Sequence, residues 1–260
     1  MEKDQVKKKV IEQFSKNAEK YIQSESHAKG KDLPLLVEWL KPQRDWIALD
    51  IATGGGHVAK TLSPHVKQVF STDLTKEMLT NTARHLTNQS CQNIFYVLAD
   101  AEKLPFLDNT FEIVTCRIAP HHFPNPQNFI NEVARVLKPG GSFLMIDNIA
   151  PEDKQLDKFM NTFEKLRDES HVRCLSVSEW RNLIKAAKLA EVNSQIRKKT
   201  HSYPTWVRVT ANNEEQIDRV SDYISNGGEE CQTYFNVSYE NKMIQSVQID
   251  EWMVLCKKES

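Results

Sequence analysis

Trp46-Ile-Ala-Leu-Asp-Ile-Ala-Thr-Gly-Gly-Gly-His57 is the segment of this 260-residue chain that indicates its fold class. A short apolar run, residues 47–51, is interrupted by one acid, Asp50, and is followed by the glycines at 54–56. Such runs are typical of parallel strands buried on both faces, and glycines let the backbone turn tightly beside a ligand. Because residues 58–62 can begin a helix, the segment predicts the strand, turn and helix that open a nucleotide-binding α/β sheet.

Two details of this loop distinguish the nucleotides that it could hold. Dinucleotide sites use Gly-x-Gly-x-x-Gly and place a pyrophosphate on the helix N-terminus, whereas Ala59 stands where the third glycine is expected. Asp50 would repel a pyrophosphate, but its carboxylate could bind an ammonium group through a charge-assisted hydrogen bond. The loop therefore favours a cationic nucleoside that carries an amino acid group.

The segment Asp50-Ile-Ala-Thr-Gly54-Gly-Gly56 resembles the first motif, acid-x-Gly-x-Gly-x-Gly, of the class I S-adenosylmethionine (SAM)-dependent methyltransferases. Ala52 replaces the first glycine, a change that is tolerable if φ is negative there. The resemblance implies that SAM is the cofactor. It implies that these loop residues bind SAM: Asp50, Ala52, Thr53, Gly54 and Gly56.

Asp73 is expected at the tip of a second strand, residues 66–72. A carboxylate at this edge of the sheet can accept hydrogen bonds from ribose hydroxyls. The alternative is an ordinary N-cap for a helix over residues 75–86. Asp73-Leu-Thr-Lys-Glu-Met-Leu79 is similar to the second motif of the ubiquinone and menaquinone methyltransferase-like group, so Leu74 and Met78 are candidate cofactor contacts or plain core residues.

A third acid, Asp100, follows a third strand predicted over residues 94–99. Asp100-Ala-Glu-Lys-Leu-Pro-Phe106 resembles the third motif of the same family. The resemblance implies that Asp100 accepts a hydrogen bond from the adenine amino group, that the amide of Ala101 reaches the adjacent ring nitrogen, and that Glu102 lies in the site. A turn-forming Asp is the alternative. The carboxyl ends of parallel strands share one edge, so the acids at 50, 73 and 100 are expected to face one ligand.

The N-terminal residues 4–24 carry an apolar stripe at helical spacing. A surface helix explains the stripe, but Phe14-Ser-Lys-Asn-Ala-Glu-Lys-Tyr21 is similar to a segment that folds over the cofactor in many small-molecule methyltransferases. In that case Tyr21 would contact the cofactor and help to exclude water. Residues 24–31 are expected to form a hinge, and residues 33–40 a second helix.

The acceptor side of the site is expected after a fourth strand, residues 111–116, which leads into Arg117-Ile-Ala-Pro-His-His-Phe123. His121 and His122 are candidate catalytic bases because imidazole titrates near neutrality. Loop packing and an orienting hydrogen bond are the alternatives for both. Arg117 is a candidate contact of the cofactor carboxylate or of an acidic substrate.

The remaining chain predicts a helix at 126–137, a fifth strand at 142–146, a sixth at 189–196 and a last, antiparallel strand at 247–256 inserted between them. Residues 131–141 resemble the family's helix before the fifth strand. Residues 148–178 and 200–240, with a helical segment at 203–225, are expected to form a substrate cap. Its aromatics are either acceptor contacts or packing: Phe159, Phe163, Tyr203 and Trp206.

The predicted fold is therefore an α/β, Rossmann-like, seven-stranded, mostly parallel sheet with an antiparallel last strand, helices on both faces and helical cap insertions. A single domain over residues 1–260 would comprise a lid helix at 1–31, a SAM-binding half at 44–147, and cap segments with the C-terminal strands at 148–260.

The overall composition narrows the partners. A net charge of −1 gives no electrostatic reason to bind nucleic acid. The five cysteines are scattered without a Cys-x-x-Cys pair, which argues against a disulfide framework or a structural metal and favours the cytoplasm. No apolar run is long enough for a membrane span. The expected partners are a small-molecule methyl acceptor and, as one option, a second copy of the chain in a homodimer.

The leading hypothesis is a SAM-dependent methyltransferase that methylates carbon or oxygen of a small molecule, by proximity and with a histidine to assist deprotonation. The alternatives are an NAD(P)-dependent oxidoreductase and a SAM-binding module without turnover.

Overall fold

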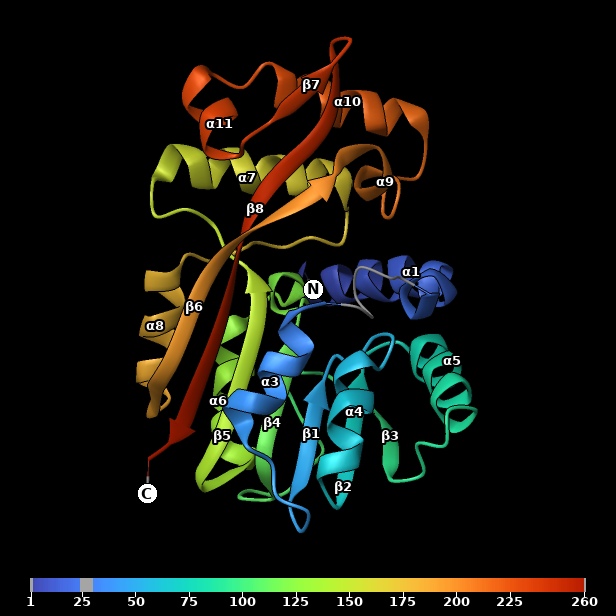
Figure 1. The fold of residues 1–260 in the computed structure, drawn as a ribbon, viewed down its shortest axis with the longest axis vertical. Coiled ribbons are helices and arrows are strands. Elements are labelled where there is room, and N and C mark those ends of the chain that lie inside the picture. The colour runs from blue at the N-terminus through green and yellow to red at the C-terminus, as the bar shows by residue number, and fades with distance from the viewer. Residues whose placement is uncertain (1, 24–29, 260) are drawn as a thin grey trace.

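A computed structural model describes residues 2–23 and 30–259, with the backbone alone for residues 2, 3 and 17–23. Its centre is one β-sheet with helices on both faces (Figure 1). The strands are β1 (Ile47–Ile51), β2 (Gln68–Asp73), β3 (Ile94–Leu98), β4 (Phe111–Arg117), β5 (Leu137–Asn148), β6 (Leu189–Ser202), β7 (Ser238–Glu240) and β8 (Met243–Lys258).

The strand order across the sheet is β3-β2-β1-β4-β5-β8-β6. The first five strands pair in parallel, whereas β8 runs antiparallel to both β5 and β6. The prediction of a mostly parallel Rossmann-like sheet, with the last strand inserted between the fifth and sixth, is confirmed. Over the described residues the sheet has eight strands rather than the predicted seven, because the short β7 pairs with β8 outside this path.

Helices cover both faces of the sheet, and further helices form an upper part of the molecule (Figure 1). They are α1 (Glu2–Gln23), α3 (Asp32–Leu40), α4 (His57–Leu62), α5 (Lys76–Thr87), α6 (Pro126–Val136), α7 (Lys154–Arg167), α8 (Val177–Ala186), α9 (Tyr203–Val207), α10 (Glu214–Ser225) and α11 (Glu229–Tyr234), with short 3₁₀ turns η1 (Ser63–His65) and η2 (Pro120–His122).

The central strands are apolar because both of their faces are buried. In β1, Leu49 and Ile51 face a core shared with α6 and α8, whereas Ala48 faces a second core shared with α3 and α4. The alternation follows the two-residue period of a strand. A parallel sheet covered on both sides leaves its loop edge as the place for a ligand.

Strands β6 and β8 continue beyond the rest of the sheet as an antiparallel ribbon, and α7, α9, α10 and α11 pack around its upper part (Figure 1). We call this part, which comprises α7, α9, α10, α11 and the upper part of the β6–β8 ribbon, the cap. The cap has a separate hydrophobic core. The cap aromatics Phe159, Phe163 and Tyr203 are buried in it, and Trp206 packs against it. The packing interpretation of these aromatics therefore fits the structure.

Three elements differ most from the sequence expectations. β5 begins at Leu137 rather than 142, because Leu137 pairs with Phe111 across a register shift. β6 extends to Ser202 because its whole length pairs with β8. The expected helix over 203–225 is two helices, and Asn213 caps the second through a hydrogen bond from the amide of Gln216.

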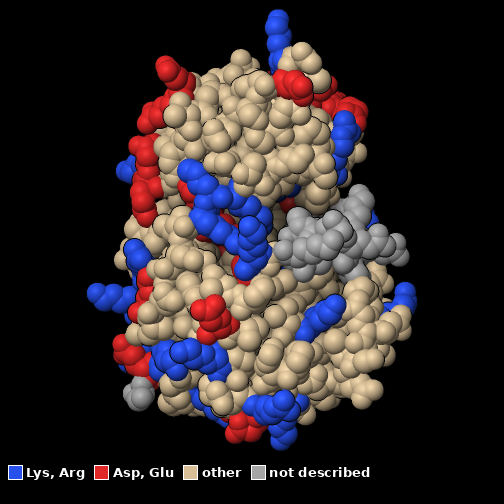
Figure 2. Space-filling model, viewed as in Figure 1, with Lys and Arg blue, Asp and Glu red and all other residues tan. Residues whose placement is uncertain are grey.

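Ion pairs join the cap ribbon to the lower part of the molecule. Figure 2 shows Lys and Arg side chains gathered at mid-height on one face. On β6, Arg197 bonds Asp32 of α3 (Nη2–Oδ1, 3.1 Å) and also pairs with Glu251 of β8. Lys199 lies 3.1 Å from the same Glu251 carboxylate. Asp32 and Glu251 are each 1% exposed, so their buried charges require these partners.

Within the described ranges, no helix combines the length and apolar composition that a bilayer crossing requires.

Candidate active site

A cavity lies at the carboxyl-end edge of β1, β2, β3 and β4, beside α1. Its empty space, which includes the solvent at its open mouth, is about 1030 Å³. The structure brings these predicted cofactor residues to its wall: Asp50, Ala52, Thr53, Gly54, Asp73, Leu74, Met78, Asp100, Ala101, Glu102 and Arg117. His122 also lines the cavity, whereas Gly56 and His121 do not.

Asp50 is a buried carboxylate at the end of β1 and is 2% exposed. The hydroxyls of Thr53 and Thr115 donate to its two oxygens at 2.6 and 2.8 Å. Burial raises the pKa of Asp50 to about 6, and the two hydroxyl hydrogen bonds only partly oppose that rise. An incoming cation would therefore favour the ionised form of this group.

Asp73, at the end of β2, accepts hydrogen bonds from the amides of Gly54 (3.1 Å) and Thr75 (2.9 Å). Burial raises its pKa in spite of these bonds. The N-cap of α5 is Thr75, so the N-cap alternative for Asp73 is wrong. Asp73 instead joins the glycine loop to the start of α5, and its carboxylate lines the cavity.

Asp100 does form a turn, since it accepts a hydrogen bond from the amide of Glu102 at 2.9 Å. It also lines the cavity, so forming the turn does not prevent its carboxylate from meeting a ligand there. Lys7 of α1 donates to Asp100 at 2.6 Å and to Glu102 at 2.8 Å. Burial disfavours the charge of Lys7, but the two carboxylates outweigh it and the pKa of Lys7 is raised. This pair of bonds holds α1 over the adjacent strand ends.

The glycine loop follows a left-handed path. Ala52, Gly54 and Gly56 have φ angles of 52°, 51° and 76°. The condition of a negative φ, under which alanine at 52 is tolerated without cost, is therefore not met, and Ala52 carries some backbone strain. A Cβ built on Gly54 would meet only the Ala52 carbonyl oxygen, at 4.0 Å, so this side of the loop is open toward the cavity.

Gly56 has a different environment from Gly54. A Cβ built on it would lie 2.5 Å from Thr82 Cγ2 and 2.8 Å from Leu86 Cδ1 of α5. Gly56 does not line the cavity, because it faces the α5 side of the loop. Gly56 is needed for the close approach of α5.

Arg117, at the end of β4, also lines the cavity, but its guanidinium forms a buried ion pair with Asp32. Its Nη2 donates to Asp32 Oδ1 at 3.2 Å. Burial of Asp32 would raise its pKa, but Arg117 lowers it below the ordinary value. This pairing draws the start of α3 to the edge of the cavity and leaves less of the guanidinium to bind a ligand.

Helix α1 contributes cavity residues that the sequence analysis did not predict. Lys7, Val10 and Phe14 of α1 line the cavity. Their spacing of three and four residues places them on one helical face, a signal that was present in the apolar stripe. The side chain of Tyr21 and residues 24–29 of the expected hinge lie outside the described residues.

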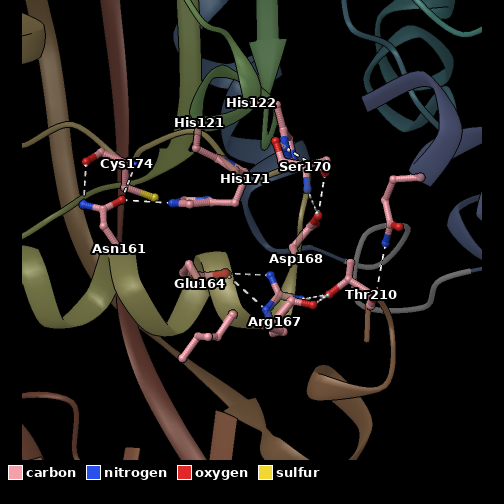
Figure 3. Close-up of polar contacts among 12 residues, drawn as sticks. His121, His122, Asn161, Glu164, Arg167, Asp168, Ser170, His171, Cys174 and Thr210 are labelled. Atoms are coloured by element: carbon pink, nitrogen blue, oxygen red, sulfur yellow. Dashed lines mark hydrogen bonds and ion pairs between the residues drawn. The ribbon is translucent and has the colours of Figure 1, made fainter. Parts of the chain in front are cut away.

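His122 is held by the loop between α7 and α8 (Figure 3). Its Nδ1 lies 3.1 Å from the backbone carbonyl of Ser170 and 3.3 Å from the Ser170 hydroxyl. A carbonyl only accepts, so Nδ1 carries the proton and Nε2 has a lone pair. Burial, followed by the neighbouring His121, lowers the pKa of His122 to about 3. His122 is therefore neutral at physiological pH.

The Nε2 atom of His122 has no hydrogen-bond partner within the described part of the chain. This atom is not fully enclosed by the protein. The residue lines the cavity, and Phe14 of α1 contacts its ring edge-on at a centroid distance of 5.1 Å. The lone pair is thus accessible to a ligand in the cavity.

His121 points elsewhere. Its Nδ1 lies 2.6 Å from Asp147 Oδ1, and its amide donates to Asp147 Oδ2 at 2.9 Å. Asp147 at the end of β5 holds the ring of His121, which does not line the cavity. Among the described residues, no three His, Cys, Asp or Glu side chains are grouped to hold a metal ion.

Comparisons with known proteins agree with this geometry. A family model described as a methyltransferase domain matches residues 49–145. The uncharacterized methyltransferase YcgJ of Bacillus subtilis (strain 168) is 36% identical over 225 residues, which cover 86% of this chain and 89% of YcgJ. The chain belongs to the SAM-dependent methyltransferases. The cofactor of this methyltransferase is SAM, and the comparisons favour it over the oxidoreductase alternative.

Two further matches support the assignment of the methyltransferase. The solved structure of BH2331 from Bacillus halodurans C-125 superposes with a TM-score of 0.86 at 37% identity, over 89% of this chain and 100% of that chain. The ubiquinone/menaquinone biosynthesis C-methyltransferase UbiE of Brucella canis is 32% identical over 161 residues, 57% of this chain and 59% of UbiE. The predicted resemblance to the UbiE-like group is confirmed.

Proposed function

We propose that this enzyme transfers the methyl group of SAM to carbon or oxygen of a small-molecule acceptor inside the cavity, and that His122 accepts the proton that the acceptor loses. The observation that carries the proposal is the meeting of four groups on one cavity wall: the carboxylates Asp50, Asp73 and Asp100, and the neutral imidazole of His122.

The residues at the cavity fit the parts of SAM. The buried carboxylate of Asp50 suits the ammonium group, and Asp73 suits the ribose hydroxyls. Asp100, with the amide of Ala101, suits the edge of the adenine. Leu74 and Met78 supply apolar surface for the adenine ring, and the open side of Gly54 leaves room for close backbone approach. This division of the acids over one ligand explains why three carboxylates gather at one sheet edge.

SAM supplies a methyl group on a positively charged sulfur, which a nucleophile takes by in-line displacement. The protein then has to align the acceptor and exclude water, which accounts for much of the rate in such reactions. We assign the exclusion of water to α1, whose residues Lys7, Val10 and Phe14 cover the cavity from the outside. The ion pair of Lys7 with Asp100 and Glu102 anchors this lid.

His122 presents a proton-accepting nitrogen to the cavity. It is neutral, its Nδ1–H is fixed by Ser170, and its Nε2 lone pair is accessible. Phe14, Phe123 and Pro124 give the adjacent cavity wall an apolar character. An acceptor with an apolar body and a removable proton, such as a phenol, an enol or an activated carbon acid, matches this surrounding.

The test combines binding and turnover on one preparation. Calorimetry should show binding of SAM and none of NAD, and incubation with methyl-labelled SAM and a cell extract should yield a small molecule that carries the label. His122→Asn should keep its affinity for S-adenosylhomocysteine (SAH) and lose turnover by about 10²-fold or more. Binding of NAD without SAM would contradict the cofactor assignment, and full turnover of His122→Asn would contradict the role of His122.

A further inference from the structure

We propose that His121 and Asp147 are positioning residues that keep one positive charge beside His122, so that His122 stays uncharged, with a lone pair on Nε2, throughout the physiological pH range. This inference rests on the proposed role of His122. It assigns a function to a buried polar cluster at the junction between the sheet and the cap, which the binding of SAM does not require.

Three histidines meet in this cluster (Figure 3). The ring centroid of His121 lies 4.2 Å from that of His122 and 5.6 Å from that of His171. The three residues are 8%, 7% and 1% exposed, respectively. Like charges so close together and so poorly solvated repel one another strongly, so the cluster cannot hold three imidazolium ions. The hydrogen bonds decide which ring keeps the charge.

His121 is the ring with a direct carboxylate partner. Asp147 is 1% exposed. Its carboxylate lies 2.6 Å from the ring Nδ1 of His121 and accepts a hydrogen bond from the backbone amide of His121 at 2.9 Å. Burial alone would favour a neutral ring, but the adjacent charge of Asp147 outweighs it and raises the pKa of His121. A protonated His121 also supplies the countercharge that a buried Asp147 carboxylate needs.

The other two rings have neutral partners. His122 donates from Nδ1 to the carbonyl of Ser170. His171 Nε2 lies 2.9 Å from Asn161 Oδ1, and this atom is fixed as the oxygen because the amide of Cys174 donates to it at 2.7 Å. Nε2 of His171 therefore carries the proton. Its Nδ1 is enclosed and without a partner in the described structure, so a second proton there would be unsolvated. Burial and the charge of His121 lower the pKa of His171.

Two other charged groups near His122, Arg167 and Asp168, have hydrogen-bond partners of their own. Arg167 bonds Glu164 at 2.7 Å and lies 4.1 Å from the centre of the Trp206 ring. Asp168 accepts from the amide and hydroxyl of Ser170, at 2.8 and 2.5 Å, and so reaches His122 only through Ser170.

The charged neighbours of His122 have opposite effects on its protonation. Asp168 favours a charge on His122, whereas Arg167 and His121 oppose it, and α1 presents the uncharged Phe14. The direct ring neighbour, His121, makes none of the hydrogen bonds with Ser170 that hold His122, so its side chain can be replaced with those bonds kept.

The test follows the ring resonances of the histidines by NMR in the ligand-free protein from pH 4.5 to 9. The proposal predicts that His121 gives imidazolium signals at pH 7, and that His122 and His171 give neutral signals down to about pH 5. In His121→Gln and Asp147→Asn the charge is lost, so the pKa of His122 should rise from about 3 into the titrated range, to above about 5. His65→Gln, at an exposed histidine, is the matched control and should leave His122 unchanged.

Turnover gives an independent readout. The wild-type rate should show no acid limb from His122 above pH 5, whereas both variants should develop one and lose about tenfold between pH 7 and pH 5 if the titration of His122 moves to near 6. A neutral His121 at pH 7, or a His122 titration that is the same in both variants as in the wild type, would overturn the proposal. Loss of turnover in His122→Asn tests the proposed function separately, because the charge on His121 is measured without any substrate.

Discussion

The affinity of the enzyme for its cofactor should depend on pH through Asp50. This carboxylate is buried, and its pKa is about 6 in the free protein. The ammonium group of the ligand stays protonated between pH 5 and pH 7. If Asp50 binds that group, the ionised form of Asp50 binds more tightly, so affinity should rise as the pH rises through about 6.

The size of the effect follows from the pKa of Asp50. With a value of about 6, about nine-tenths of Asp50 is ionised at pH 7 and about one-tenth at pH 5, so the affinity should fall about tenfold, or about 1.4 kcal/mol. The free energy of unfolding of the free protein should fall as the pH rises, in contrast to the affinity. A group whose pKa is raised from 3.8 to about 6 on folding stabilises the free protein below 3.8, and this contribution is lost as the pH rises through about 6.

Calorimetric titration with SAH, which retains the amino acid group, measures the effect at several pH values. Asp50→Asn should reduce the affinity at pH 7 by about ten- to a hundredfold, the range for a hydrogen bond to a charged group, and should flatten the pH dependence. Asp45→Asn, at an exposed acid just before β1, is the matched control and should behave as the wild type. A tenfold pH dependence that survives in Asp50→Asn would refute the assignment of Asp50 to the ammonium group.

Three further outcomes test other parts of the site and fold. Asp73→Ala should weaken SAH binding by about 1–3 kcal/mol in calorimetry because a ribose hydroxyl loses its acceptor, and unchanged affinity would remove Asp73 from the site. Gly56→Ala should lower the free energy of unfolding by more than about 1–2 kcal/mol in denaturant titrations, because φ is 76° and the new Cβ meets α5. Gly228→Ala, with nothing within 4 Å, is its control, and equal losses would contradict the packing argument. Phe163→Ala should destabilise the cap core by about 3–5 kcal/mol and leave the SAH affinity intact, since Phe163 lies outside the cavity; a large drop in affinity would show that the cap shapes the site.

The sheet and the place of its ligand were readable from local patterns. The apolar runs before Asp73 and Asp100 predicted buried parallel strands, and parallel strands bring their carboxyl ends to one edge. The structure does place Asp50, Asp73 and Asp100 on one cavity wall. The capping box of Ser176 and Glu179 at the start of α8 was equally local, because its partners lie within one helical turn.

The roles of individual side chains required the tertiary structure. Gly54 and Gly56 are neighbours in one motif, yet one faces the cavity and the other faces α5, a difference that depends on where α5 packs. Lys7 reaches Asp100 across 93 positions of the chain, and no periodic pattern connects the two residues.

His121 and His122 show most clearly the difference between what the sequence and what the tertiary structure determined. From the chain alone, His121 and His122 were equivalent candidates for the proton acceptor. Asp147 lies 26 positions from His121, and Ser170 lies 48 positions from His122. Local patterns identify strands and helices because backbone hydrogen bonds and burial repeat at fixed spacings. The charge and direction of a buried side chain depend instead on partners that only the packing of the cap against the sheet brings within hydrogen-bonding distance.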